Sequence, residues 1–343
     1  MNPGAHPELG SVAAVVRRGD AIEAWHAASV AVVDGAGQLS HAFGEPTLST
    51  LTRSSIKPFQ CIALLTSGAA DAYALSAEEL AIACASHSGT DEHVRVVRGL
   101  LEKAGAKPSD LQCGAHLPIG FRLSGKTPTA GEAADPLRNA CSGKHAGFLL
   151  LSHHLGAPLP EYLEPEGVVQ RAVRAGLALA CGVDGERLPR GIDGCSAPNY
   201  GLSLEVLARS MLRLAHPETA PPKLAAALTK IRDAMLAQPL MVSGERRFDY
   251  ELMSAYPGNC LSKVGAEGLQ LIAFREPALA LAMKLHDGTE RALPAICVSL
   301  LTELGLDAAN RAELAGHVRP AIHNHRKLVT GEIIATLRLK RIS

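Results

Sequence analysis

The chain has 343 residues, of which 47% are hydrophobic and 3% aromatic, and its formal net charge at pH 7 is zero. The length suits one large domain or two ordinary ones, and the neutral charge disfavours nucleic-acid binding, which needs a basic surface. No run of about 18 apolar residues is present, so we expect no membrane span, and we expect no secretory signal.

The N-terminal part is predicted to form strands. Val12 to Val16 and Ala28 to Val33 are apolar, β-branched runs, and Asp34 to Gly37 is a turn signal, so an antiparallel pair is expected. Eight cysteines are scattered along the chain, several in apolar runs, as Cys61 is. This usage is typical of reduced thiols rather than of a disulfide framework, and it predicts a cytoplasmic protein.

From Ser54 to about Asp233 the pattern is mainly helical. Because proline is tolerated only in the first turn of a helix, Pro58 predicts that a long helix begins near Ser54 or Ser55. Ser76 to Glu79 is a capping box that starts another helix. Further helices are expected over 91–104, 202–214 and 224–236, and a mobile loop over 125–135.

Strand character returns near the C-terminus, at Leu269 to Ala273, Ala278 to Lys284 and Ile333 to Leu339, with Asp287-Gly288 predicted as a hairpin turn. The order of strands, helices and strands predicts an α+β fold, in which an antiparallel sheet from both chain ends is flanked by helices. We expect a single domain over 1–343, with its sheet at about 1–53 and 240–343 and an inserted helical lobe at about 54–239.

Three motifs follow one another along the chain: Ser54-Ser55-Ile56-Lys57, Ser86-His87-Ser88-Gly89 and Lys263-Val264-Gly265. Their order is similar to that of the active-site elements of penicillin-binding proteins and serine β-lactamases. They predict a serine nucleophile activated by lysine, and therefore acyl transfer. A lone Ser-x-x-Lys is usually a chance match, and a lone serine there is usually a helix cap.

The spacing also predicts how this chemistry is arranged. Ser54 lies near a helix N-terminus, where free amides can stabilise an oxyanion, and Lys57 projects from the same helix face. Lys57 must be neutral to accept a proton. Lys263 is a candidate second cation that favours this state, and it can equally serve as the base for Ser86.

Two cysteines in turns of small residues, Cys141 and Cys195, could bind zinc as thiolates. The spacing alone does not supply four ligands, and two buried, unpaired cysteines are the commoner arrangement. Histidines 87, 145, 153 and 154 could serve as metal or acid–base groups, although each taken singly is more often a packing residue.

Four segments together resemble the signatures of the rhizobial-type, or class 3, L-asparaginases: Arg53 to Gln60, Cys84 to Gly89, Cys141 to Gly147 and Gly191 to Cys195. The resemblance extends from about residue 12 to residue 337. It implies hydrolysis of L-asparagine to L-aspartate and ammonia by a homodimer with a fold similar to serine β-lactamases.

The resemblance also implies roles for individual residues. The catalytic set would be two Ser–Lys tandems, Ser54 with Lys57 and Ser86 with Lys263. One zinc ion per protomer would be held by Cys141, Lys144 and Cys195, and would assist substrate binding rather than activate the nucleophile. Substrate contacts are expected from Arg53, Asp193, His145 and Lys144.

The chain departs from the family pattern in two places. Arg138 to Ala140 stands where a His-Asn-Asn-like run is expected, and Ala321 to Lys327 lacks a glycine after its asparagine. We favour Ser54 as the nucleophile with Ser86 as proton relay, although the two roles could be exchanged. The alternatives are a glutaminase, a β-lactamase-like or D,D-peptidase amidase, and a non-catalytic zinc or amino-acid sensor.

Overall fold

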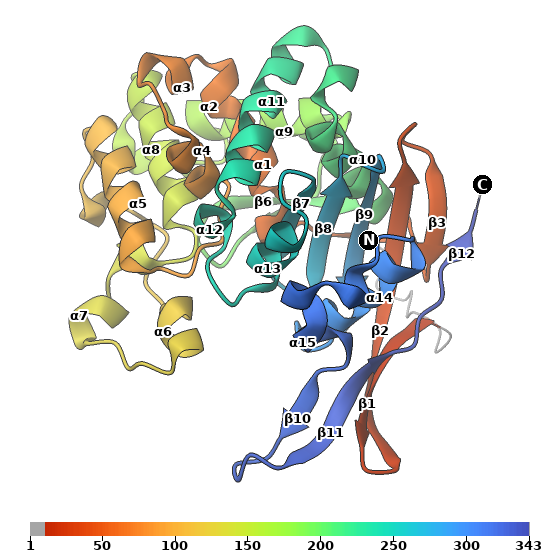
Figure 1. Cartoon of the computed structure of the whole chain (residues 1–343). Helices are drawn as coiled ribbons and strands as arrows, with labels where there is room; N and C mark the ends of the chain where they lie inside the picture. Colours follow the sequence, from red (N-terminus) through yellow and green to blue (C-terminus); the bar gives the residue numbers. More distant parts are fainter. Residues whose placement is uncertain (1–10, 343) are drawn as a thin grey trace.

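The computed structural model describes residues 11–342, which form an antiparallel sheet with helices on both of its faces (Figure 1). The strands run in the order β10-β11-β1-β2-β9-β8-β7, and β3 branches from β2 to pair with β12. The strands of this sheet are β1 (Val12–Arg18), β2 (Ala21–Asp34), β3 (Leu39–Phe43), β7 (Cys260–Gly265), β8 (Leu269–Phe274), β9 (Leu279–Leu285), β10 (Ala321–His323), β11 (Val329–Ala335) and β12 (Lys340–Arg341).

A helical part is inserted between the N-terminal and C-terminal strands, and it contains a small sheet in the order β4-β6-β5. Its strands are β4 (Ser49–Leu51), β5 (Arg190–Ile192) and β6 (Pro198–Ser203). The α-helices of the chain are α1 (Lys57–Gln60), α2 (Ile62–Thr66), α3 (Ala69–Ala72), α4 (Ala77–Ala83), α5 (Asp91–Lys103), α6 (Ile119–Ser124), α7 (Ala130–Ala133), α8 (Ser142–His154), α9 (Val168–Cys181), α10 (Leu204–Ala215), α11 (Pro222–Ala237), α12 (Pro239–Val242), α13 (Phe248–Ala255), α14 (Leu293–Glu303) and α15 (Ala315–Val318).

The large sheet is buried on both faces, so alternate residues of its strands enter two different cores. Along β8, Leu271 joins the core that contains the inserted helices, whereas Ile272 joins the core beneath α13 and α14. This alternation follows from the two-residue repeat of a strand. All six residues of β8 are buried, which explains why its sequence is apolar at every position except Gln270 rather than alternating.

The predicted order of strands, helices and strands is confirmed, as is the α+β architecture with its antiparallel sheet drawn from both chain ends. The expected N-terminal pair is β1 with β2, and Ser76 caps α4 through a complete capping box. The helices expected over 91–104, 202–214 and 224–236 are α5, α10 and α11. The domain limits stay a prediction, and residues 1–10 of the expected sheet part lie outside the described range.

Four local predictions are wrong. The long helix expected from Ser54 is a 3₁₀ turn, Arg53–Ile56, followed by the short helices α1 and α2, although Pro58 does lie in the first turn of α1. Asp287-Gly288 leads from β9 into α14 rather than into a hairpin, because the next segment is helical. The last apolar strand is Val329–Ala335, and the loop expected over 125–135 contains α7, which Thr129 caps.

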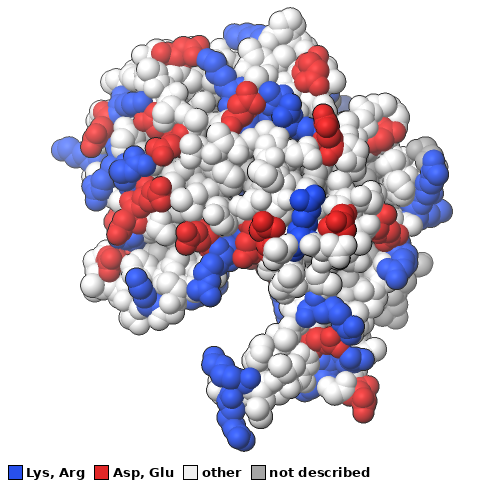
Figure 2. All heavy atoms as spheres, viewed as in Figure 1, with Lys and Arg blue, Asp and Glu red and all other residues white. Residues whose placement is uncertain are grey.

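Positive and negative side chains are interspersed over the face shown in Figure 2, with a hollow between the helical part and the β10–β11 arm. Within residues 11–342, no helix is both long and apolar enough to cross a membrane.

Candidate active site

Three of the four predicted catalytic side chains meet at the hydroxyl of Ser86, which follows α4. The amino groups of Lys57, at the start of α1, and Lys263, on β7, lie 3.1 Å and 2.9 Å from Ser86 Oγ. Both lysines are fully buried. Ser86 therefore connects the two amino groups and can pass a proton between them.

Ser54 lies in the 3₁₀ turn before α1 and is only partly buried. Among the described residues, no hydrogen bond joins Ser54 Oγ to Lys57 Nζ, which instead donates to the carbonyl of Ala85 at 2.5 Å. Arg53, the residue before Ser54, has a φ of 48°, in the left-handed region that a non-glycine residue rarely adopts. Backbone strain of this kind is often found at functional sites.

The environment of Lys263 favours its neutral form. Burial is the largest influence and, with the nearby cations Lys57 and Arg247, it lowers the pKa of Lys263 to about 7, while Asp249 opposes the shift. A lysine that titrates near neutral pH can both accept and return a proton under those conditions. The sequence offered Lys263 either as a cation beside Lys57 or as the base for Ser86, and its 2.9 Å contact with Ser86 Oγ is compatible with the second role.

A second cluster places the two predicted zinc-binding cysteines beside a lysine. Lys144 Nζ lies 3.1 Å from Cys195 Sγ, and the neighbouring Cys195 thiol is the main influence that holds the pKa of Cys141 well below its ordinary value. Lys57 Nζ is 3.3 Å from Cys141 Sγ, so this cluster adjoins the serine site. Burial alone would lower the pKa of Lys144, but the two thiols outweigh it and raise the pKa. Across residues 11–342, no three His, Cys, Asp or Glu side chains are grouped as a metal site.

The remaining predicted substrate residues have internal partners. Arg53 Nε donates to Asp193 at 2.7 Å, and its backbone amide donates to Asn199 at 3.1 Å, which fixes the turn that carries Ser54. Burial would raise the pKa of Asp193, but Lys144 and Arg53 outweigh it and hold that pKa low. His145 is buried, and its Nδ1 lies 2.7 Å from the Tyr162 hydroxyl. Burial keeps the pKa of His145 well below its ordinary value.

Two residues of the site could not be recognised from the sequence. Asp249, on α13, accepts hydrogen bonds from the Val264 amide at 2.9 Å and the Ser262 hydroxyl at 2.7 Å, so it anchors β7 on both sides of Lys263. Arg247 donates to the carbonyl of Ser86. The only sequence signal for either residue is its charge, at the N-cap of α13 for Arg247 and in the first turn of α13 for Asp249.

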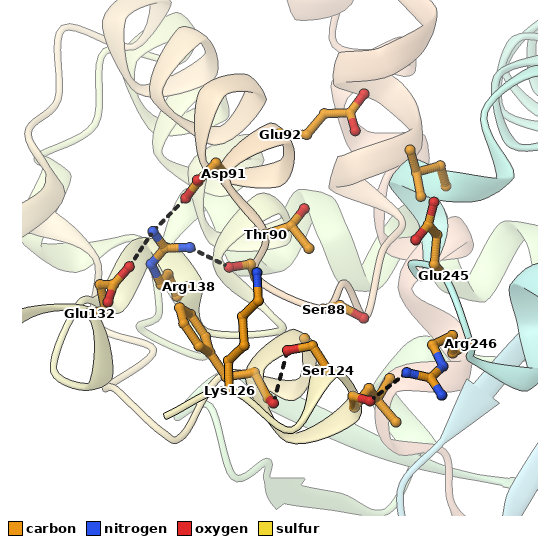
Figure 3. A pocket seen from close by; sticks show the side chains of 15 residues that line it. Ser88, Thr90, Asp91, Glu92, Ser124, Lys126, Glu132, Arg138, Glu245 and Arg246 are labelled. Carbon is orange, nitrogen blue, oxygen red and sulfur yellow. Dashed lines mark hydrogen bonds and ion pairs between the residues drawn. The ribbon is translucent and has the colours of Figure 1, made fainter. Parts of the chain in front are cut away.

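Arg138, where the chain departs from the expected family pattern, has a structural role at a cavity of about 560 Å³ near the serine site (Figure 3). Arg138 donates to Asp91 at 2.6 Å and to the Gly89 carbonyl at 2.8 Å, and it approaches Glu132 at 3.5 Å. It therefore ties the α7 segment to the start of α5. Ser88, two residues after Ser86, lies at the edge of this cavity.

The sequence profile of a known family, described as L-asparaginase II, matches residues 14–335. No curated protein is significantly similar to the chain. Among solved structures, a β-lactamase from Mycobacterium bovis is similar, with 13% sequence identity and a TM-score of 0.41 over 80% of this chain and 94% of the other.

Proposed function

Because the chain belongs to the L-asparaginase II family and is an amidohydrolase of that type, we propose that it hydrolyses L-asparagine to L-aspartate and ammonia through a serine acyl-enzyme. The observation that carries the mechanism is the pair of buried amino groups on Ser86 Oγ. This arrangement supplies a base and a proton relay without histidine.

In the proposed reaction, Ser54 Oγ attacks the side-chain amide carbon of L-asparagine. Its proton moves to the Ser86 and lysine cluster, and from there to the departing ammonia. Water then hydrolyses the ester, with the same groups removing its proton. Ser54 is the preferred nucleophile because Ser86 already binds both lysines, whereas no described side chain holds Ser54 Oγ by a hydrogen bond.

Zinc is proposed as a resident metal, one ion per protomer. Two thiols and one amine lie together at Cys141, Cys195 and Lys144, and this donor chemistry would suit a zinc ion. Lys144 must lose a proton to serve as a ligand. When bound, the ion would supply positive charge that orients the substrate. Deprotonation of the nucleophile is assigned to Lys57 and Lys263.

A homodimer is also proposed. It is supported by the large apolar side chains exposed on the arm formed by β1, β2, β10 and β11, where Ile22 is 60%, Trp25 58% and Val329 67% exposed. Light scattering of the purified chain tests this directly, and a monomeric mass would contradict it. A cytoplasmic location stays a prediction from the usage of the cysteines.

The test of function is ammonia release from L-asparagine and from L-glutamine, beside the colour change of a chromogenic β-lactam, with and without added zinc. We expect turnover of L-asparagine well above the other two. One methylene changes discrimination by only about 1–3 kcal/mol, so some glutamine hydrolysis is compatible with the proposal. Faster β-lactam turnover would favour the amidase alternative, and no turnover by the folded, zinc-loaded chain would favour a sensor.

A further inference from the structure

A cavity of about 210 Å³ lies behind the strand that carries Lys263. Adjacent residues of a strand point to opposite faces. Lys263 reaches Ser86, whereas Val264 lines the cavity. The other walls come from α6, α13, α14, α15, β8 and the segments before α13 and α14. Helices α6 and α13 face the hollow in the lower middle of Figures 1 and 2.

The cavity is lined by three arginines: Arg122, Arg246 and Arg247. Arg246 donates to the Leu123 carbonyl at 2.8 Å, and Arg247 donates to the Ser86 carbonyl. Within residues 11–342, no carboxylate forms an ion pair with any of the three, whose positive charge is opposed at the cavity wall by Glu290 and Asp249. A carboxylate ligand would therefore meet several guanidinium groups that form no ion pair within the described residues.

Two buried polar atoms on the same walls also lack partners. Ser243 Oγ and Gln270 Oε1 belong to residues that are 1% and 0% exposed, and neither atom has a hydrogen-bond partner among the described residues. A buried polar atom without a partner is costly, so each such atom in a folded protein calls for an explanation. A ligand with both donor and acceptor groups would satisfy these two atoms.

We propose that this cavity binds a small α-amino acid, with its carboxylate against the arginines and the Ser243 hydroxyl and its ammonium group toward Gln270 Oε1. The choice of L-aspartate as the probe rests on the proposed function, since it is the expected product. The bound molecule is a second amino acid rather than the one that reacts, because no proposed catalytic side chain lines the cavity. It lies next to Arg247, and so one contact away from Ser86.

The experiment is calorimetric titration of the purified chain with L-aspartate. Ser243→Ala removes a hydroxyl that has no internal partner, so this variant should keep its melting temperature but bind L-aspartate about tenfold more weakly. The double variant Arg122→Ala/Arg246→Ala should show at least the same loss. Arg95→Ala, an exposed arginine on α5, is the matched control and should bind as the parent chain does.

The stoichiometry separates this cavity from the catalytic site. Two L-aspartate molecules per chain, with one weakened in the variants, support the proposal and show that the product also binds at a second place. One per chain, weakened in the variants, supports binding at the cavity alone. Unchanged binding in both variants, or no binding to any form, would overturn the proposal. Binding by a chain that releases no ammonia would leave this inference standing and remove the proposed function.

Discussion

Replacement of Lys263 by methionine should stabilise the fold while it abolishes turnover. Lys263 is fully buried, and burial with the neighbouring cations lowers its pKa to about 7. A lysine in the unfolded chain has a pKa of about 10.4. Below pH 7, the folded state must therefore either hold a buried charge or release a proton. This lowers the free energy of unfolding of the parent chain by about 4–5 kcal/mol, and the hydrogen bonds of Lys263 offset part of that loss.

The sign of the pH dependence follows from proton counts. Between pH 7 and about 10.4 the unfolded chain binds one more proton at this site than the folded chain, so the stability of the parent rises with pH. From pH 6 to pH 9 this single group should add about 2.5 kcal/mol to the free energy of unfolding of the parent. Lys263→Met lacks this contribution, so its advantage over the parent should shrink by that amount.

Urea unfolding at pH 6 and pH 9 measures both quantities. Lys230→Met is the control, because Lys230 is about half exposed and its replacement should change neither value appreciably. The reasoning would be refuted if Lys263→Met were less stable than the parent at pH 6, or if the difference between the two chains were the same at both pH values.

Three further outcomes are expected. Asp249→Asn removes the charge that raises the pKa of Lys263, so the acid limb of the kcat/KM profile should move to lower pH; an unmoved limb would argue against Lys263 as the base. Cys195→Ser should lower zinc content, measured by plasma emission, and raise KM more than it lowers kcat, whereas an unaltered zinc content would place the metal elsewhere. Gly143→Ala brings a Cβ to 2.2 Å from the Ile82 carbonyl and should cost about 2–4 kcal/mol in thermal unfolding. Gly131→Ala has open space and is its control; equal effects would contradict the packing argument.

The sequence predicts elements that local patterns determine. The capping box at Ser76 depends on a few neighbouring residues and occurs where expected. Pro58 lies in the first turn of a helix as predicted, but its position does not specify the length of that helix, which is short. Asp287-Gly288 failed because a turn signal does not specify which element follows it. Strand β5 was missed because three residues are too few for a periodic signal, and β6 was missed because its sequence begins with proline and contains glycine, which weaken a strand pattern.

The site was predicted as a set of residues but not as a geometry. Motif order selected Ser54, Lys57, Ser86 and Lys263, yet only the tertiary fold shows that both lysines meet at Ser86. Asp249 reaches β7 through a packing of α13 on the sheet that no spacing rule encodes.

The most direct test of the central claim is mass spectrometry of the chain after acid quenching during turnover of L-asparagine. We predict a β-aspartyl ester on the peptide that contains Ser54, present in the parent and absent from Ser54→Ala, with ammonia release lost in that variant. An ester on Ser86 instead, or full ammonia release by Ser54→Ala, would contradict the assignment of Ser54 as the nucleophile.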